Sequence, residues 1–268
     1  MKWRAVAGVA LRQYYLLRGS PIRLVPVFIW GAIDIVLWGF ITRYLNTVGG
    51  SHIDFVPQLL GGVLFWDFST RIMMGVTVAF LEDVWARNFL NLFASRLLIS
   101  EYLLGLVLTS IATGLLSLAV MMALTVLLFG LNLLSFAALI APMLMVLFLF
   151  GTALGIIATA IMLRFGPASE WIVWPIPVLV APFVGVFYPI STLPGWMQPL
   201  ATALPPSYVF ELLRSASAGR AVNLGTLLWP ATLAIVQVIL AATLFAFLYR
   251  GVVRSGLLAR FSAEGSSA

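Results

Sequence analysis

The sequence contains no cysteine and a single histidine, His52. Disulfides, thiol redox chemistry and zinc sites built from Cys and His are therefore excluded. His52 lies in a short predicted loop, where it makes a poor catalytic base. Paired aspartates of the kind that hold magnesium on a diphosphate substrate are also missing. We therefore expect no metal site and no catalytic residues in this chain.

Lysine is almost as scarce, since Lys2 is the only one. It follows no glycine-rich loop, so the chain cannot contain a Walker A sequence, in which a lysine contacts the nucleotide phosphates. Any energy from ATP must therefore come from another chain. We expect no cofactor on this chain itself.

Charged residues make up only 9% of the chain, hydrophobic residues make up 62%, and the mean hydropathy is +1.10. Soluble domains carry roughly 25% charged residues, so these values indicate an integral membrane protein. The 268 residues suffice for about six membrane helices, with no room for a separate soluble domain. We predict a single all-α domain over residues 1–268, with spans at about 24–42, 57–79, 101–129, 136–163, 171–188 and 225–249.

The fifteen Lys and Arg residues are unevenly distributed between the predicted connections. Eleven fall on one side of the predicted membrane, three fall on the other, and Arg71 lies inside the second span. The positive-inside rule then places both termini in the cytoplasm. The basic residues form no single stripe, so the net charge of +6 favours membrane orientation over nucleic-acid binding. The eleven are Lys2, Arg4, Arg12, Arg18, Arg23, Arg87, Arg96, Arg164, Arg250, Arg254 and Arg260, and the three are Arg43, Arg214 and Arg220.

Residues 1–20 are amphipathic and lack the apolar core and cleavage site of a signal peptide. We predict an interfacial helix with its basic residues off the apolar face. That face comprises Trp3, Val6, Val9, Ala10, Tyr14 and Leu17. A disordered basic tail is the alternative. At the other end, residues 255–268 form a predicted cytoplasmic tail.

The connection over residues 80–96 is long, charged and amphipathic, unlike the other connections. Its apolar residues Leu81, Trp85, Phe89, Leu92 and Phe93 recur at helical spacing, which predicts a helix in the membrane plane. Such a helix either joins two spans or docks a cytoplasmic partner. Two acidic residues in its predicted first turn, at positions 82 and 83, would favour the helix dipole and do not by themselves indicate docking.

Three charged residues fall in the interior of predicted spans, away from the span ends, where charge is costly. Asp67 and Arg71 are four residues apart and share a helical face, so we expect them to pair. Asp34 is alone in the first span. The alternatives for the three residues are that they line a polar cavity and so contact substrate, that they pair across helices, or that they lie nearer a membrane interface.

Residues 185–214 are apolar but broken by Pro189, Pro194, Pro199, Pro205 and Pro206. Each internal proline removes a backbone donor, so at most two short helices fit, near 193–203 and 207–214. Broken elements persist at membrane depth only when they pack on protein or line a watery cavity. Glu211 and Arg214 either pair with each other or contact substrate.

Two stretches resemble a known family. GVFYPISTLPGWMQPLATALPPSYVFELLR, residues 185–214, is similar to the Gly-aromatic-Pro, Leu-Pro, Pro-Leu, Pro-x-x-Tyr and Glu-x-x-Arg pattern of type-2 ATP-binding-cassette exporter permeases. That family includes drug, Nod-factor, O-antigen and teichoic-acid exporters. FLEDVWARNFLNLFASRLLISEYLLG resembles the same family's cytoplasmic segment. Arg96 stands where many relatives have proline, which puts the end of that segment in question.

The resemblance implies a six-helix permease half driven by two cytoplasmic ABC ATPases that bind Mg-ATP. Residues 80–96 would be a coupling helix that inserts into an ATPase, and residues 189–214 would be re-entrant helices forming an exit gate. The implied coupling residues are Glu82, Asp83, Trp85, Arg87 and Phe89. The implied gate residues are Tyr188, Trp196, Tyr208, Phe210, Glu211 and Arg214.

From these features we expect a permease in a bacterial plasma membrane that moves an amphiphilic or lipid-linked substrate outward. A homodimer is expected, with a heterodimer as the alternative, in contact with membrane lipids and with no nucleic acid. Two further alternatives are a channel for O-antigen or another polysaccharide and a scaffold that docks an ABC ATPase without transporting.

Overall fold

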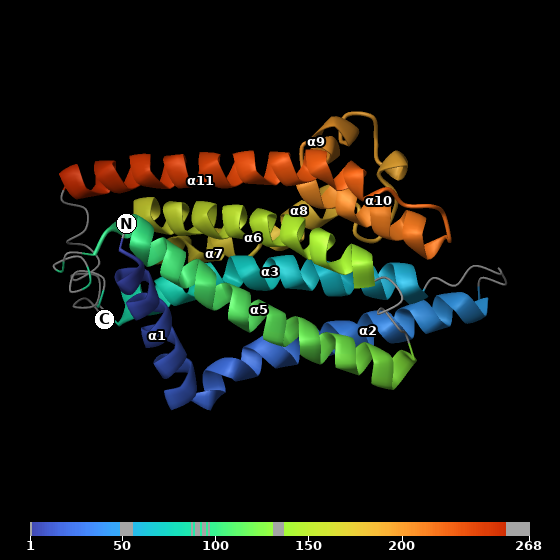
Figure 1. Cartoon of the computed structure of the whole chain (residues 1–268), viewed down its shortest axis with the longest axis horizontal. Helices are drawn as coiled ribbons and strands as arrows, with labels where there is room; N and C mark the ends of the chain where they lie inside the picture. The colour runs from blue at the N-terminus through green and yellow to red at the C-terminus, as the bar shows by residue number, and fades with distance from the viewer. Residues whose placement is uncertain are drawn as a thin grey trace.

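Long helices lie side by side along the molecule in the computed structural model (Figure 1). The structure describes residues 2–48, 56–86, 88, 92, 95, 97–130 and 137–255. Throughout these residues the ordered elements are α- or 3-10 helices. The predicted all-α fold is confirmed.

Ten α-helices form the described part of the chain. They are α1 (Trp3–Gly19), α2 (Val25–Val48), α3 (Val56–Trp85), α5 (Ile99–Phe129), α6 (Ala137–Phe165), α7 (Glu170–Val173), α8 (Ile176–Val184), α9 (Gln198–Thr202), α10 (Pro205–Ser217) and α11 (Leu228–Arg254). Short 3-10 helices precede α2, α7 and α11 and follow the turn after α8.

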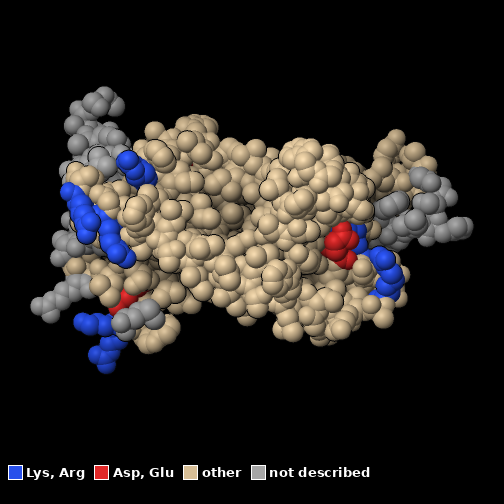
Figure 2. All heavy atoms as spheres, turned by 90° about the horizontal axis from the view of Figure 1, so that it is seen from above, with Lys and Arg blue, Asp and Glu red and all other residues tan. Residues whose placement is uncertain are grey.

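Five of the helical stretches are long and apolar enough to cross a membrane. They are Ile22–Val48, Gln58–Trp85, Ile99–Phe129, Ala138–Phe165 and Leu224–Arg254. Each overlaps a predicted span. The chain is thus a multi-pass membrane protein, and charged side chains gather at its two ends on the face shown in Figure 2.

The fifth predicted span, over 171–188, is not a continuous helix. Because Pro175 and Pro177 cannot donate a backbone hydrogen bond, the helix is interrupted between α7 and α8. Gly185 then ends α8 in the left-handed conformation, with φ of 68°. The stretch Glu170–Val184 gives about 22 Å of helix at 1.5 Å per residue, short of the roughly 30 Å hydrocarbon core. Six full spans are therefore not confirmed.

Helices α3 and α6 form the centre of the bundle and bury most of their surface. Their backbones approach closely at Gly151, where an added Cβ would lie 2.4 Å from the carbonyl oxygen of Ser69. The Ser69 hydroxyl donates to the carbonyl oxygen of Leu147 on α6 at 3.0 Å. Small residues of this kind allow tight helix packing where lipid provides no hydrophobic driving force.

Helix α3 continues to Trp85, six residues beyond the predicted end of the second span. The acidic residues Glu82 and Asp83 therefore lie in the last turn of α3 and not in the first turn of a new helix. Of the coupling helix predicted over 80–96, the first six residues belong to α3, and most of the remainder lies outside the described residues. Residues 256–268 of the predicted tail also lie outside them.

Candidate functional site

Helices α1 and α10 lie at opposite ends of the bundle (Figure 1). A group of polar contacts lies beside each of them. At the first end, helix α1 crosses the start of α5. Val6 and Val9 of α1 are buried there, as the amphipathic pattern predicts. An added Cβ at Gly105 would lie 2.5 Å from the Cβ of Val9, so a larger residue would push α1 away. Trp3 and Tyr14, expected on the same apolar face, are exposed.

The carboxylate of Asp83 joins three helices at this end. Both Nη atoms of Arg12 on α1 donate to the two Asp83 carboxylate oxygens. The hydroxyl of Tyr102 on α5 donates to Asp83 Oδ2 at 2.7 Å. Asp83 and Tyr102 are buried, while Arg12 is partly exposed. We call these three residues the Asp83 cluster.

Two further contacts attach α1 and the segment after it to α5 and α3. Arg23 Nη1 donates to Glu82 Oε2 at 3.0 Å, in a partly exposed ion pair with α3. The backbone N–H of Lys2 donates to Glu101 Oε1 at 2.5 Å. Glu101 also accepts from the N–H of Leu98 at 3.2 Å, at the N-terminus of α5, where a carboxylate is favourable.

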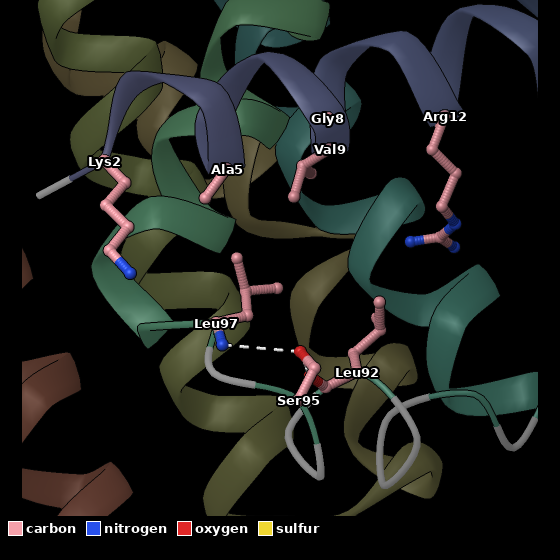
Figure 3. Close-up of a pocket in the computed structure, with 8 residues that line it drawn as sticks. All are labelled: Lys2, Ala5, Gly8, Val9, Arg12, Leu92, Ser95 and Leu97. Carbon is pink, nitrogen blue, oxygen red and sulfur yellow. Dashed lines mark hydrogen bonds between the residues drawn. The ribbon is translucent and has the colours of Figure 1, made fainter.

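A cavity of about 360 Å³ separates α1 from the connection that follows α3 (Figure 3). Its lining residues are Lys2, Ala5, Gly8, Val9, Arg12, Leu92, Ser95 and Leu97. The Leu97 N–H donates to the Ser95 hydroxyl at 3.3 Å on the wall opposite α1.

Of the five implied coupling residues, Glu82 and Asp83 form intramolecular ion pairs. Trp85, at the end of α3, is 56% exposed and presents an aromatic surface to the outside of the chain. Arg87 and Phe89 lie outside the described residues.

The predicted pair inside the second span forms as expected. Arg71 Nε and Nη2 donate to the two carboxylate oxygens of Asp67, each at 3.1 Å. Arg71 Nη1 also donates to the carbonyl oxygen of Pro26 on α2, at 3.3 Å. Asp34 on α2 is half-buried and close enough to Asp67 and Arg71 to interact electrostatically. The three residues therefore lie together where α2 meets α3.

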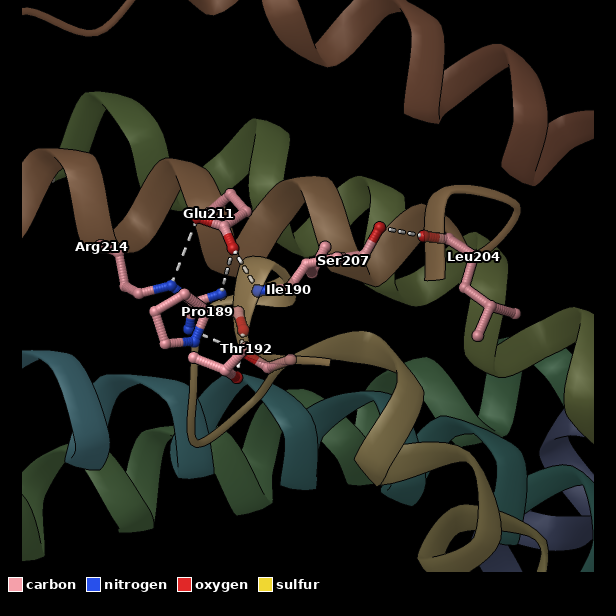
Figure 4. A network of polar contacts seen from close by, with 8 residues as sticks. Pro189, Ile190, Thr192, Leu204, Ser207, Glu211 and Arg214 are labelled. Carbon is pink, nitrogen blue, oxygen red and sulfur yellow. Dashed lines mark hydrogen bonds and ion pairs between the residues drawn. The ribbon is translucent and has the colours of Figure 1, made fainter. Parts of the chain in front are cut away.

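At the opposite end, Glu211 and Arg214 on α10 hold the turn after α8 (Figure 4). Arg214 Nη2 donates to Glu211 Oε1 at 2.9 Å, and Arg214 Nη1 donates to the Gly185 carbonyl at 2.7 Å. Glu211 Oε1 also accepts from the N–H of Ile190 at 2.9 Å. Burial raises the pKa of the Glu211 carboxyl, but the hydrogen bonds from Arg214 and Ile190 outweigh it, so the pKa lies below its usual 4.5.

The aromatic gate residues differ in their exposure and in their hydrogen bonds. The hydroxyls of Tyr188 and Tyr208 donate to the carbonyl oxygens of Pro182 and Thr202, at 2.8 and 2.9 Å. Phe210 is buried and lies edge to face with Trp66, with centroids 6.4 Å apart. Trp196 is 69% exposed. The predicted short helices are present as α9 and α10, and Trp196 is the most exposed of the gate residues.

The sequence model of the ABC-2 type transporter family matches residues 22–217, which include the gate segment and four of the five long helices. The chain belongs to this family. A comparison with curated proteins gives no match. As an ABC-2 permease, the chain is the membrane component of an ABC transporter, and it works with ABC ATPase subunits.

In this ABC-2 permease, sequence reasoning missed Arg12, Glu101 and Tyr102 as site residues. Glu101 offered a signal, because it is a lone carboxylate at the start of an apolar span. Arg12 and Tyr102 offered none, because their pairing with Asp83 depends on which helices adjoin.

Proposed function

We propose that this ABC-2 permease exports an amphiphilic or lipid-linked substrate, driven by Mg-ATP hydrolysis in two cytoplasmic ATPases. The observation that carries the proposal is the separation of two built sites at opposite ends of the bundle. The end with α1 carries the Asp83 cluster and exposed Trp85. The other end carries the proline-broken segment fastened by Glu211 and Arg214.

The orientation follows from charge. Eight described Lys and Arg residues belong to α1 and its flanking residues or to the ends of α6 and α11 beside it, at the α1 end of the bundle. They are Lys2, Arg4, Arg12, Arg18, Arg23, Arg164, Arg250 and Arg254. The positive-inside rule supports placing that end in the cytoplasm, and we assign the protein to a bacterial plasma membrane. The broken segment is then the outer gate, and Trp85 faces the ATPase.

The state of the gate favours an amphiphile over a polysaccharide. Glu211, Arg214 and the hydroxyls of Tyr188 and Tyr208 all bond to protein atoms. A glycan site needs polar groups that can bond to sugar hydroxyls. The surface offered by Trp196 is mainly apolar, which suits an acyl chain or a lipophilic ring.

A second copy of the chain completes the permease. Helices α7 and α8 are broken by proline, and such elements persist at membrane depth only against protein or a watery cavity. Yet Val178 on α8 is 73% exposed, and Trp171 and Leu179 are exposed beside it. A homodimer that covers this face satisfies the constraint.

The experiment is co-expression with the cognate ABC ATPase, followed by purification through a tag on the permease. Trp85→Ala should reduce ATPase recovery at least about tenfold, as expected for loss of a central aromatic anchor. The matched control is Trp196→Ala, which removes another exposed tryptophan at the other end, 69% exposed against 56% for Trp85. Equal recovery with both variants would contradict the docking role of Trp85.

A further inference from the structure

We propose that Asp83 is a positioning residue of the transport cycle. By holding Arg12 and Tyr102, it makes α1 and the start of α5 move together with the end of α3 that leads to Trp85. The inference rests on the proposed function, because it concerns how movement of the ATPase reaches the membrane helices. Helix α1 then transmits movement of the ATPase to the membrane helices, in addition to lying on the membrane surface.

The position of Asp83 is unfavourable for a carboxylate by itself. It lies in the last turn of α3, where the partial negative charge of the helix terminus repels an anion. Its side chain is only 1% exposed, so the charge is also removed from water. Burying a charge costs several kcal/mol unless good ionic and hydrogen-bond partners compensate it. Arg12 and Tyr102 are those partners.

Stability alone does not account for this arrangement. Well-packed apolar residues in place of a buried ion pair are often neutral or stabilising. An ion pair instead fixes one relative placement, because both Nη atoms of Arg12 reach the same carboxylate. Tyr102 bonds to one of those two oxygens. Helices α1 and α5 therefore cannot shift against the end of α3 without breaking a buried contact.

The other contacts described above connect α1 less directly to α3. Lys2 with Glu101, and Val9 with Gly105, attach α1 to α5 only. Arg23, in the 3-10 helix that follows α1, does reach α3 through Glu82. Both side chains of that pair are partly exposed, at 34% and 26%, whereas the Asp83 side chain is 1% exposed. Exposed pairs contribute little. Asp83 is two residues from Trp85, so a force on Trp85 reaches α1 first through Asp83.

The test uses the permease in nanodiscs with its ATPase. Because the chain contains no cysteine, spin labels can be attached at Leu11→Cys on α1 and Phe165→Cys on α6, two exposed sites. We expect the distance between the labels to change when ATP binds. Asp83→Asn should remove that change and lower transport per ATP hydrolysed at least about tenfold, while the ATPase still binds and hydrolyses ATP.

Tyr102→Phe provides a milder variant, since it keeps the packed ring and removes one hydrogen bond. It should lower transport per ATP by about fivefold and reduce the distance change. Arg18→Gln, which removes an exposed charge from the same helix, should match the wild type. If Asp83→Asn and Tyr102→Phe both keep the wild-type distance change and the wild-type ratio of transport to ATP hydrolysis, the proposed role of Asp83 is overturned. A wild-type chain that binds no ATPase would instead overturn the proposed function.

Discussion

Arg214 Nη1 donates a 2.7 Å hydrogen bond to the carbonyl oxygen of Gly185, across 29 positions of the chain. Gly185 is where α8 ends, and Arg214 belongs to α10. One buried guanidinium therefore binds the end of the broken helix to the segment that precedes α11. Glu211 completes the connection through the N–H of Ile190.

Arg214→Ala should destabilise the gate. It leaves the Gly185 carbonyl without its charged donor and Glu211 without its cation, and each charged hydrogen bond contributes about 1.5–3 kcal/mol. We expect a loss of at least about 2 kcal/mol in the apparent free energy of unfolding, measured by titration with a denaturing detergent. Arg43→Ala, an exposed arginine at the same end, should change it by less than about 0.5 kcal/mol. A loss for Arg214→Ala no greater than that for Arg43→Ala would contradict this role of Arg214.

The same connection predicts a pH dependence. The pKa of Glu211 is lower in the folded protein than its usual 4.5. The stability that the carboxylate provides is therefore fully present above the unfolded pKa and lost as pH falls through the folded pKa. Melting curves from pH 7 to about pH 3 should show a smaller acid-induced loss in Glu211→Gln than in wild type. Identical acid profiles would refute this role for Glu211.

Replacing glycine by alanine should have opposite effects on stability at Gly151, where α6 packs closely on α3, and at Gly251, where space is open. Gly151→Ala places a methyl group 2.4 Å from the Ser69 carbonyl oxygen, so we expect a loss of about 1–3 kcal/mol from overpacking. Gly251→Ala lies on α11, with nothing within 4 Å of the added carbon. It should leave stability unchanged or raise it by up to about 1 kcal/mol through helix propensity. Thermal melting in detergent gives both values.

The proposed homodimer predicts where two copies touch. Val178→Cys, on the exposed face of α8, should form a disulfide-linked dimer in membranes under mild oxidation. Leu240→Cys is the control, because it is also exposed, at 61%, but lies on α11 and not on the α7 and α8 face proposed for the dimer. It should remain monomeric on a non-reducing gel. Cross-linking at Leu240 and not at Val178 would place the second copy against α11 and contradict the proposed dimer face.

The sequence predicted what depends on local pattern. Hydropathy located the five long helices, and the spacing of Asp67 and Arg71 identified their pair. Hydropathy did not reveal the break within residues 171–188, because it measures apolarity and ignores the backbone donors lost at Pro175 and Pro177. That stretch is as apolar as a span but cannot continue as one helix.

Contacts between helices that are far apart along the chain could not be predicted from the sequence. Periodicity indicates which side of a helix is apolar, but it does not say which helix lies against that side. The ion pair of Arg12 with Asp83 joins residues 71 positions apart. The end of α3 was also misplaced, because Glu82 and Asp83 look like the polar start of a new helix until Arg23 and Arg12 are seen beside them.

Vectorial transport in proteoliposomes tests the central claim most directly. The permease and its ATPase are reconstituted with a phospholipid that carries a fluorescent headgroup, and ATP is supplied on the ATPase side. We predict ATP-dependent movement of the label to the opposite leaflet, detected by a membrane-impermeant quencher and abolished by Trp85→Ala. ATP hydrolysis by the assembled complex without movement of that lipid or of a lipophilic drug would contradict the account and favour a scaffold.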